Sequence, residues 1–204
     1  MGFTQRQNTS YGFSGIPDTG IYEYEENCGA HHYDRISVVV RHAKGCLLYD
    51  ENGKAYLDCL AAYSAANPGH HHPDLVKAVR DALEGGYGSV LSNVVYSDPL
   101  GVFLSKMANF APQLGLRFGA NGNKVLPKNG GVESVETAIK TMRYYGYKQK
   151  GIPDGKQEII VFDNNFHGRT ISVVSFSSSE KNRKGFGPLT PGFVSVPLDR
   201  KSVV

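Results

Sequence analysis

Two adjacent glycines, Gly130 and Gly131, stand directly before an amphipathic run in the stretch "LPKNGGVESVETAIKTMR", residues 126–143. Because glycine has no Cβ atom, backbone N–H groups at this point can approach an anion closely. The run predicts a helix that begins near Val132, and this helix adds the positive end of its dipole. Phosphate is the ligand that such an arrangement favours.

Two carboxylates at the start of the same run support a second interpretation. Glu133 and Glu136 lie in or near the first turn of the predicted helix, where each acidic side chain stabilises a helix by about 0.3–1 kcal/mol. The segment could therefore be an ordinary turn and a capped helix without a ligand. The loop matches neither G-x-x-x-x-G-K-[ST] nor G-x-G-x-x-G, which argues against a nucleoside triphosphate or a dinucleotide.

A second group of candidate residues follows the next predicted strand. In "IIVFDNNFHGRT" an apolar strand ends and presents Phe166, His167, Gly168 and Arg169 at the sheet edge where the glycine pair is expected. A phenylalanine alone is more often a core residue, and an arginine after glycine is more often a solvated residue at a helix start. Together with the glycine pair they predict a flat, phosphorylated, aromatic cofactor, for which ring stacking contributes roughly 0.5–1.5 kcal/mol.

Strand and helix alternate along the part of the chain that must position these residues. The segment "HPDLVKAVRDALEGG" predicts a helix that begins at Pro73 and stops at Gly85, and "SDPLGVFLSKMANFAPQLG" repeats the design. "NKVLP", the helix after the glycines, "QEIIVFDN", "GRTISVVSFS" and "GFVSVPL" follow. This order predicts an α/β fold with a mostly parallel sheet and helices on both faces, with ligands at the carboxyl ends of the strands.

The N-terminal third has a different pattern. Residues 1 to about 35 are rich in Gly, Tyr and small polar residues, which predicts an irregular arm that becomes ordered against another surface. "GCLLYDENGKAYLDCL" predicts a β-hairpin that turns at residues 51–53. The run His70, His71 and His72 suggests a metal site, but three consecutive side chains cannot all reach one ion. We expect a helix-entry turn near a subunit interface there, with no metal.

Composition limits the class of protein. With 204 residues, 40% apolar and 20% charged, the chain can bury a substantial core. Its formal charge of +3 is dispersed, so nucleic acid is not an expected partner. The sequence has no run long enough to cross a membrane and starts without a signal-peptide pattern, so we expect a cytoplasmic protein. Cys28, Cys46 and Cys59 show no zinc-type spacing and predict reduced thiols.

The motifs resemble a known family. "LPKNGGVESVETAIK" followed by "VFDNNFHGRT" is similar to the class III pyridoxal-phosphate aminotransferases, and "AAYSAANPGHHHPDLVKA" with "GAHHY" resembles the members that act on ornithine. The resemblance runs from about residue 29 to residue 198. It implies a fold type I enzyme with pyridoxal 5'-phosphate as cofactor, a large cofactor domain, a smaller domain and a homodimeric assembly.

The resemblance also implies roles for the cofactor-binding residues. The backbone amides of Gly130, Gly131 and Val132 would bind the cofactor phosphate. The family often has Ser or Thr at the position of Gly130, so one hydroxyl contact is expected to be absent. Phe166 would stack on the pyridine ring, with His167 beside it.

Three residues are expected to bind the substrate, and the two tyrosines among them carry the assignment of ornithine. The resemblance implies that Tyr33 and Arg169 hold the α-carboxylate end of ornithine, and that Tyr63 favours ornithine over acylated or shorter amines. Without the resemblance, Tyr63 reads as a core tyrosine and Tyr33 as an interface residue. The implied reaction moves the δ-amino group of ornithine to 2-oxoglutarate, giving glutamate semialdehyde and glutamate. The alternatives are acetylornithine or another ω-amino-acid aminotransferase, and a non-catalytic phosphate-binding module.

The resemblance divides the chain into parts. Residues 1–63 are expected to form the arm and hairpin of the small domain, and residues 64–198 the first part of the large domain. Residues 199–204, "DRKSVV", are similar to a translated sequencing adapter and are expected to be non-native. The Schiff-base lysine and the aspartate that pairs with the pyridinium nitrogen would lie further downstream, and Lys140 is a poor substitute. The chain alone is therefore expected to be inactive.

Overall fold

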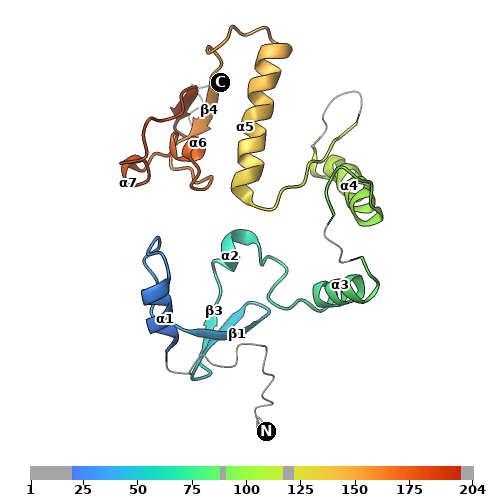
Figure 1. The fold of residues 1–204 in the computed structure, drawn as a ribbon, viewed down its shortest axis with the longest axis vertical. Helices are drawn as coiled ribbons and strands as arrows, with labels where there is room; N and C mark the ends of the chain where they lie inside the picture. The colour runs from blue at the N-terminus through green and yellow to red at the C-terminus, as the bar shows by residue number, and fades with distance from the viewer. Residues whose placement is uncertain (1–19, 88–90, 117–121, 199–204) are drawn as a thin grey trace. The chain divides into compact units, whose positions relative to one another are not determined.

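The computed structural model describes residues 20–87, 91–116 and 122–198. The chain separates into two compact units, Met1–Val95 and Tyr96–Val204 (Figure 1). The beginning of the predicted arm and the predicted non-native tail lie outside the described residues. The division of the chain at residues 63 and 64 stays a prediction.

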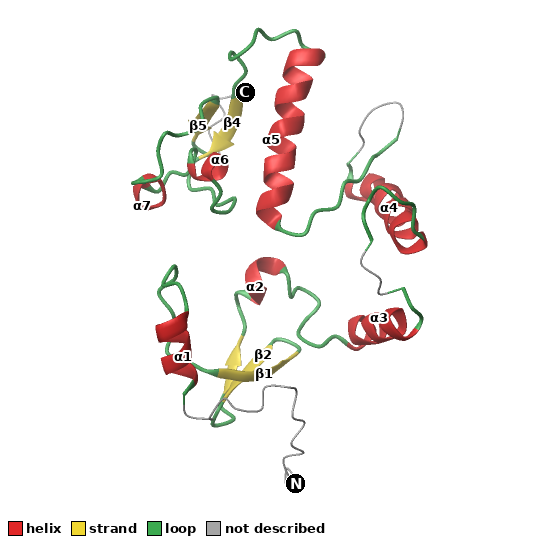
Figure 2. Cartoon of the chain, viewed as in Figure 1, coloured by secondary structure: helices red, strands yellow, loops and turns green. Residues whose placement is uncertain are grey.

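The first unit is built on a three-stranded antiparallel sheet in the order β1-β2-β3 (Figure 2). The Asp50 carboxylate closes the turn between β2 and β3, because its Oδ1 accepts the N–H groups of Asn52 and Lys54, both at 2.9 Å. The predicted hairpin is therefore confirmed, including its turn at residues 51–53. The strands are β1 (Val40–Lys44), β2 (Leu47–Asp50) and β3 (Ala55–Leu57).

The predicted arm is not irregular throughout. Helix α1 spans Ile21–Cys28 and has no buried residue. The chain that follows turns back on this helix, where Arg35 Nη1 donates to Glu25 Oε2 at 2.6 Å. The prediction of an irregular arm is thus wrong for these eight residues. Their apolar positions are too few to give a helical periodicity in the sequence.

Both helices predicted between the hairpin and the glycine pair are present. Helix α3 spans Pro73–Glu84 and ends at Gly85, and helix α4 spans Asp98–Phe110 before a short 3-10 turn, η1 (Ala111–Leu114). The two helices belong to different units. Neither buries a residue. The apolar face of α3 is exposed at Leu75, Val76, Val79 and Leu83.

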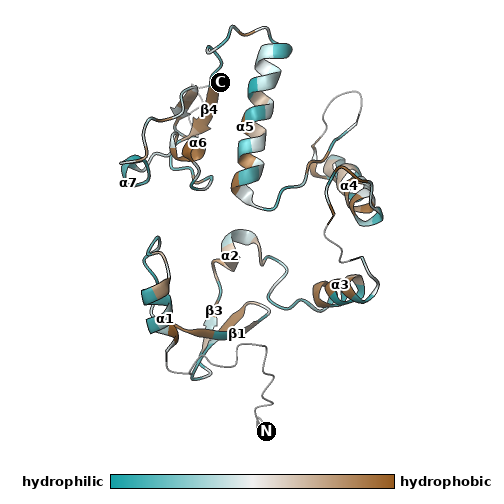
Figure 3. Cartoon of the chain, in the orientation of Figure 1, coloured by the Kyte–Doolittle hydropathy of each residue, from teal (hydrophilic) through white to brown (hydrophobic). Residues whose placement is uncertain are grey.

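The second unit holds the core of the described structure. Helix α5 packs beside two parallel strands and the short helix α6 (Figure 1). Ile139 of α5 is buried against Val173 and Phe176, and apolar residues gather on β4 and α6 (Figure 3). The elements are α5 (Gly131–Lys148), β4 (Ile159–Phe162), α6 (Ile171–Val174), α7 (Glu180–Arg183) and β5 (Phe193–Val196).

The α/β class is confirmed, but one predicted strand does not form. Residues 123–127, "NKVLP", have no strand conformation among the described residues. A strand needs a neighbour with which to exchange backbone hydrogen bonds, and the parallel sheet described here consists of β4 and β5 alone. In β4 the side chains alternate, so that Ile159 and Val161 pack against the core while Ile160 is 63% exposed.

This alternation predicts a difference between two isoleucines. In the 204-residue chain, Ile139→Ala should lower the free energy of unfolding by about 2–5 kcal/mol, because it leaves a cavity in the core. Ile160→Ala, at an exposed position, should change it by less than about 1 kcal/mol. Urea unfolding followed by circular dichroism measures both. Equal losses would contradict the assignment of α5 and one face of β4 to a shared core.

Candidate functional site

The N-terminal end of α5 lacks a side-chain cap. Its N-cap residue is Gly130, in an extended conformation with φ −122° and ψ 154°. The Gly130 N–H donates to Glu133 Oε2 at 2.8 Å, so the glutamate supplies one half of a capping box. Glycine has no hydroxyl to supply the other half. The next amides, of Gly131 and Val132, point beyond the helix end as the first N–H groups of any helix do.

The side-chain positions of the two glycines are uncrowded. A Cβ atom built on Gly131 would meet no described atom within 4 Å. One built on Gly130 would meet only the Glu133 side chain, at 3.7 Å. The backbone of Gly131 is therefore uncrowded on its side-chain side, at a helix end where the dipole favours negative charge.

The loop after β4 lies directly against this helix end. Gly168 has φ +116°, and a Cβ atom built on it would lie 2.5 Å from Val132 Cγ2. Only glycine allows this contact, because both the backbone angle and the space exclude a side chain. Thr170 Oγ1 also donates to Glu136 Oε1 on α5. The two loops that the sequence predicts on one sheet edge thus contact each other.

The same loop is fixed to the core on its other side. Asn165 Nδ2 donates to the carbonyl oxygens of Phe162 at 2.6 Å and Phe176 at 3.1 Å. The Asn164 N–H donates to Ser178 Oγ at 2.8 Å. Side-chain hydrogen bonds to backbone carbonyls hold a loop in one conformation. The residues between Asn165 and Thr170 are therefore presented by a loop anchored at both ends.

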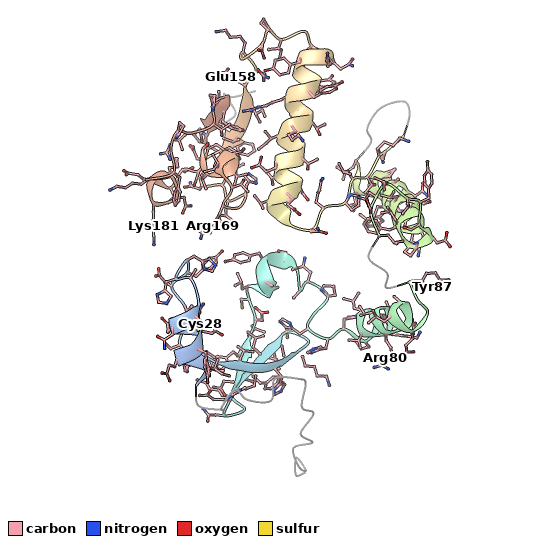
Figure 4. The ribbon with its side chains drawn as sticks, viewed as in Figure 1. Cys28, Arg80, Tyr87, Glu158, Arg169 and Lys181 are labelled. Atoms are coloured by element: carbon pink, nitrogen blue, oxygen red, sulfur yellow. The ribbon has the colours of Figure 1, made fainter. Side chains whose placement is uncertain are left out.

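The three side chains predicted to form the ring site have different surroundings. His167 is exposed, and one side of its ring faces the buried Phe176, with the two ring centroids 5.7 Å apart. Phe166 is 55% exposed, and Arg169 Cζ lies 5.9 Å from the Phe166 ring centroid. Arg169 extends from the loop close to the start of α6 (Figure 4). An aromatic face and a guanidinium are therefore presented by the loop that contacts the first turn of α5.

Sequence reasoning did not identify the residues that fix this loop. It read Glu136 only as a helix-capping carboxylate, whereas the structure gives it the Thr170 hydroxyl as a partner. Asn165 was not singled out. No spacing rule signals these contacts, because their partners lie far apart in the sequence or are backbone atoms.

Tyr63 lies in the first unit, in a turn of unusual handedness. Helix α2 (Ala61–Ser64) has positive φ angles of 47°, 47°, 56° and 72° along its length. The Tyr63 side chain is 63% exposed, so the alternative of a core tyrosine is wrong. Tyr33, also in this unit, is 44% exposed, and its ring centroid lies 4.7 Å from that of His32.

The three consecutive histidines contact three separate groups. His70 Nε2 lies 2.7 Å from Asp58 Oδ2, and His71 Nδ1 lies 2.8 Å from the Ala43 carbonyl oxygen. The His72 ring is the N-cap of α3. The predicted helix-entry turn is therefore confirmed.

The described helices include none that is long and apolar enough to span a bilayer.

Comparison with known proteins identifies the family. The model of the family described as aminotransferase class-III matches residues 28–204. The chain belongs to the class III aminotransferases. The contact between the α5 N-terminus and the loop after β4 is thus a feature of a class III aminotransferase chain, whose fold is that of fold type I pyridoxal-phosphate-dependent enzymes.

Individual relatives cover most of this class III chain but a smaller part of their own length. It is 41% identical over 177 residues to ornithine aminotransferase of Brevibacillus brevis, which is 87% of this chain and 42% of that protein. The ornithine aminotransferase structure from Toxoplasma gondii ME49 superimposes with a TM-score of 0.77 at 30% identity, covering 88% of this chain and 40% of that one. Acetylornithine aminotransferase from Elizabethkingia anophelis gives a TM-score of 0.64 at 40% identity, with coverages of 87% and 40%. The chain spans about two fifths of these relatives.

The close approach of Gly168 to Val132 generates a prediction. Gly168→Ala should destabilise the second unit by about 1–3 kcal/mol from backbone strain, with a further loss from the clash. Gly155→Ala is the matched control, because Gly155 has φ +71° but open space around a built Cβ. Urea unfolding of both variants should show the larger loss for Gly168→Ala. Equal losses would mean that the loop does not need to contact the helix.

Proposed function

We propose that this chain forms the phosphate-binding and ring-binding part of an ornithine aminotransferase that uses pyridoxal 5'-phosphate. The supporting observation is the contact between Val132, in the first turn of α5, and Gly168, in the loop that carries Phe166, His167 and Arg169. One side of this junction suits a phosphate, and the other presents an aromatic face and a cation. The identity to ornithine aminotransferases supports the substrate.

The residues present fit the cofactor phosphate, with one adjustment. The amides of Gly131 and Val132 belong to the first turn of α5, which has no partner for them within the helix, whereas the Gly130 N–H donates to Glu133. We propose that the first two amides bind the phosphate directly. The Gly130 N–H joins them when the Glu133 side chain rotates away, which the exposed position of this residue allows.

The aromatic part of the cofactor fits the loop after β4. Phe166 would stack on the pyridine ring, and His167, braced by the buried Phe176, would lie beside it. The bound cofactor supplies an electron sink for transamination. The protein side chains orient the ring and exclude water from one of its faces. The lysine and aspartate that the family chemistry needs are proposed to lie in the part of the relatives that this chain does not span.

The substrate is proposed to bind through its charged end. The guanidinium of Arg169 suits a carboxylate, because its planar group donates two parallel hydrogen bonds. It would hold the α-carboxylate of ornithine together with Tyr33, so that the δ-amino group faces the cofactor. Tyr63 would set the preference for ornithine. 2-Oxoglutarate, which then accepts the amino group, also presents a carboxylate to Arg169.

The assembly and location are parts of the same proposal. We propose a homodimer because the family resemblance implies one. The cytoplasmic location and the absence of nucleic acid and membrane as partners are proposed from the sequence pattern and the dispersed charge. Size-exclusion chromatography with light scattering on the complete enzyme tests the assembly. A monomeric active enzyme would contradict it.

A second candidate activity is supported by one comparison. The 40% identity to an acetylornithine aminotransferase favours a site that accepts the acylated substrate. Values of kcat/KM for ornithine and N-acetylornithine on the complete enzyme distinguish the two activities. A preference for N-acetylornithine would overturn our substrate assignment.

A non-catalytic phosphate-binding module would instead bind inorganic phosphate as well as it binds pyridoxal phosphate.

The phosphate site is tested by a pair of variants at the start of α5. Gly131→Val should weaken pyridoxal-phosphate binding by about tenfold or more, because the branched side chain fills the space in front of the amides. Gly131 has no positive φ, so the change tests access without adding that strain. Glu133→Gln should change affinity by about threefold or less, since an amide oxygen can still accept the Gly130 N–H.

Titration of the cofactor, followed by absorbance, measures both affinities. Circular dichroism of each variant checks that α5 remains folded. Equal affinities of the two variants would contradict a phosphate at this helix end.

The role of Tyr63 is tested in a complete enzyme. Tyr63→Ile should lower the kcat/KM ratio of ornithine to 4-aminobutyrate, a shorter ω-amine, by about tenfold, because the ring and hydroxyl that position ornithine are removed. Tyr87→Ile is the matched control, since Tyr87 belongs to the same unit and is also 63% exposed. An unchanged ratio in Tyr63→Ile would make Tyr63 a structural residue.

A further inference from the structure

The turn that carries Tyr63 is strained and must be held by its surroundings. Four consecutive residues, Ala61 to Ser64, have left-handed φ angles, and none of them is glycine. Each such residue costs about 1–2 kcal/mol relative to a right-handed conformation. Strain of this kind persists only where neighbouring contacts determine the backbone, and it concentrates at functional sites.

The carboxylate of Asp58 determines the start of the turn. Asp58 Oδ1 accepts the N–H groups of Leu60 at 3.0 Å and Ala61 at 2.9 Å. Its own N–H donates to the Cys46 carbonyl oxygen at 2.9 Å, in the turn between β1 and β2. The Asp58 side chain is only 10% exposed. This residue therefore joins the strained turn to the sheet.

His70 fixes the other end of the same segment. Its Nε2 lies 2.7 Å from Asp58 Oδ2, and its backbone exchanges two hydrogen bonds with Gly45, at 2.8 and 3.0 Å. Gly69 adopts φ +92°, and a Cβ atom there would lie 3.2 Å from Gly45 Cα. Both ends of residues 58–70 are thus attached to one turn and to each other, as in an Ω-loop.

The charge state of Asp58 suits this role. The hydrogen bond with His70, followed by that from the Ala61 N–H, holds the pKa of the Asp58 carboxyl below its ordinary value. The group is therefore ionised at neutral pH and accepts hydrogen bonds with both oxygens. The loop that displays the exposed Tyr63 ring is closed by a charged acceptor at its base.

We propose that Asp58 is a specificity-determining positioning residue, which clamps residues 58–70 through Leu60, Ala61 and His70 so that the left-handed turn presents Tyr63 to the substrate. This inference rests on the proposed contact between Tyr63 and ornithine. Asp58 does not touch the substrate itself. Asp58 acts by keeping the Tyr63 backbone in the left-handed conformation, which tyrosine does not favour.

The experiment compares Asp58→Asn with Tyr63→Ile in a complete enzyme, singly and together. Asp58→Asn should lower the kcat/KM ratio of ornithine to 4-aminobutyrate by about three- to tenfold, because the turn loses its charged anchor. In the Tyr63→Ile background the same change should alter the ratio by less than about twofold. Such non-additivity is the signature of one residue acting through another.

A matched control separates positioning from stability. Asp50 also accepts two backbone N–H groups, at 2.9 Å each, and the Tyr56 hydroxyl at 2.9 Å, but it lies outside the loop that carries Tyr63. Asp50→Asn should lower the melting temperature to a similar degree while leaving the substrate ratio unchanged. If Asp58→Asn does not fold, His70→Leu removes the other half of the clamp and should lower the ratio in the same way.

The outcomes distinguish this inference from the proposed function. An unchanged ratio in Tyr63→Ile overturns the substrate role of Tyr63 and with it the basis of the clamp. A lowered ratio in Tyr63→Ile, with no change in Asp58→Asn, overturns the clamp alone. A ratio that falls additively in the double variant also overturns it, because Asp58 would then act independently of Tyr63.

Discussion

The contact between Gly168 and Val132 is the constraint on which the second unit's site depends. It brings a loop that follows β4 against the first turn of α5, at a distance that no side chain on residue 168 would permit. The hydrogen bond from Thr170 to Glu136 then holds the loop in place. Without this approach, the first turn of α5 and the loop that carries the aromatic ring would be two separate surface features. With it, they lie at one junction, where we propose the phosphate and the ring of the cofactor to bind.

The first unit uses a different means to present a residue. Its loop at residues 58–70 is held by hydrogen bonds at the base, and the tip carries four residues in a disfavoured conformation. The two units therefore fix a loop of the candidate site in two different ways. Glycine makes an otherwise forbidden approach possible in one unit, and a partly buried carboxylate, Asp58, stabilises an otherwise costly turn in the other.

Features set by local periodicity could be predicted from the sequence. Helices α3, α4 and α5 and the hairpin turn follow from apolar spacing, proline starts and glycine stops, and the two candidate loops follow from strand order. The left-handed turn could not be predicted, because Ala, Tyr and Ser are ordinary right-handed residues and the contacts of Asp58 and His70 are needed to reverse them. The strand predicted at residues 123–127 failed for a similar reason, because it also depends on contacts outside the segment. A strand needs a partner strand, and its own sequence does not specify that partner.

The hydrogen bond between the Gly130 amide and Glu133 has a consequence for how the site is filled. A carboxylate of the chain itself occupies one N–H donor at this helix end. Under the proposed function, the third amide would be gained by exchange, because an incoming phosphate would have to displace the Glu133 carboxylate from the Gly130 N–H. The glutamate supports the first helical turn when no phosphate is bound, and it would compete with phosphate from a high local concentration.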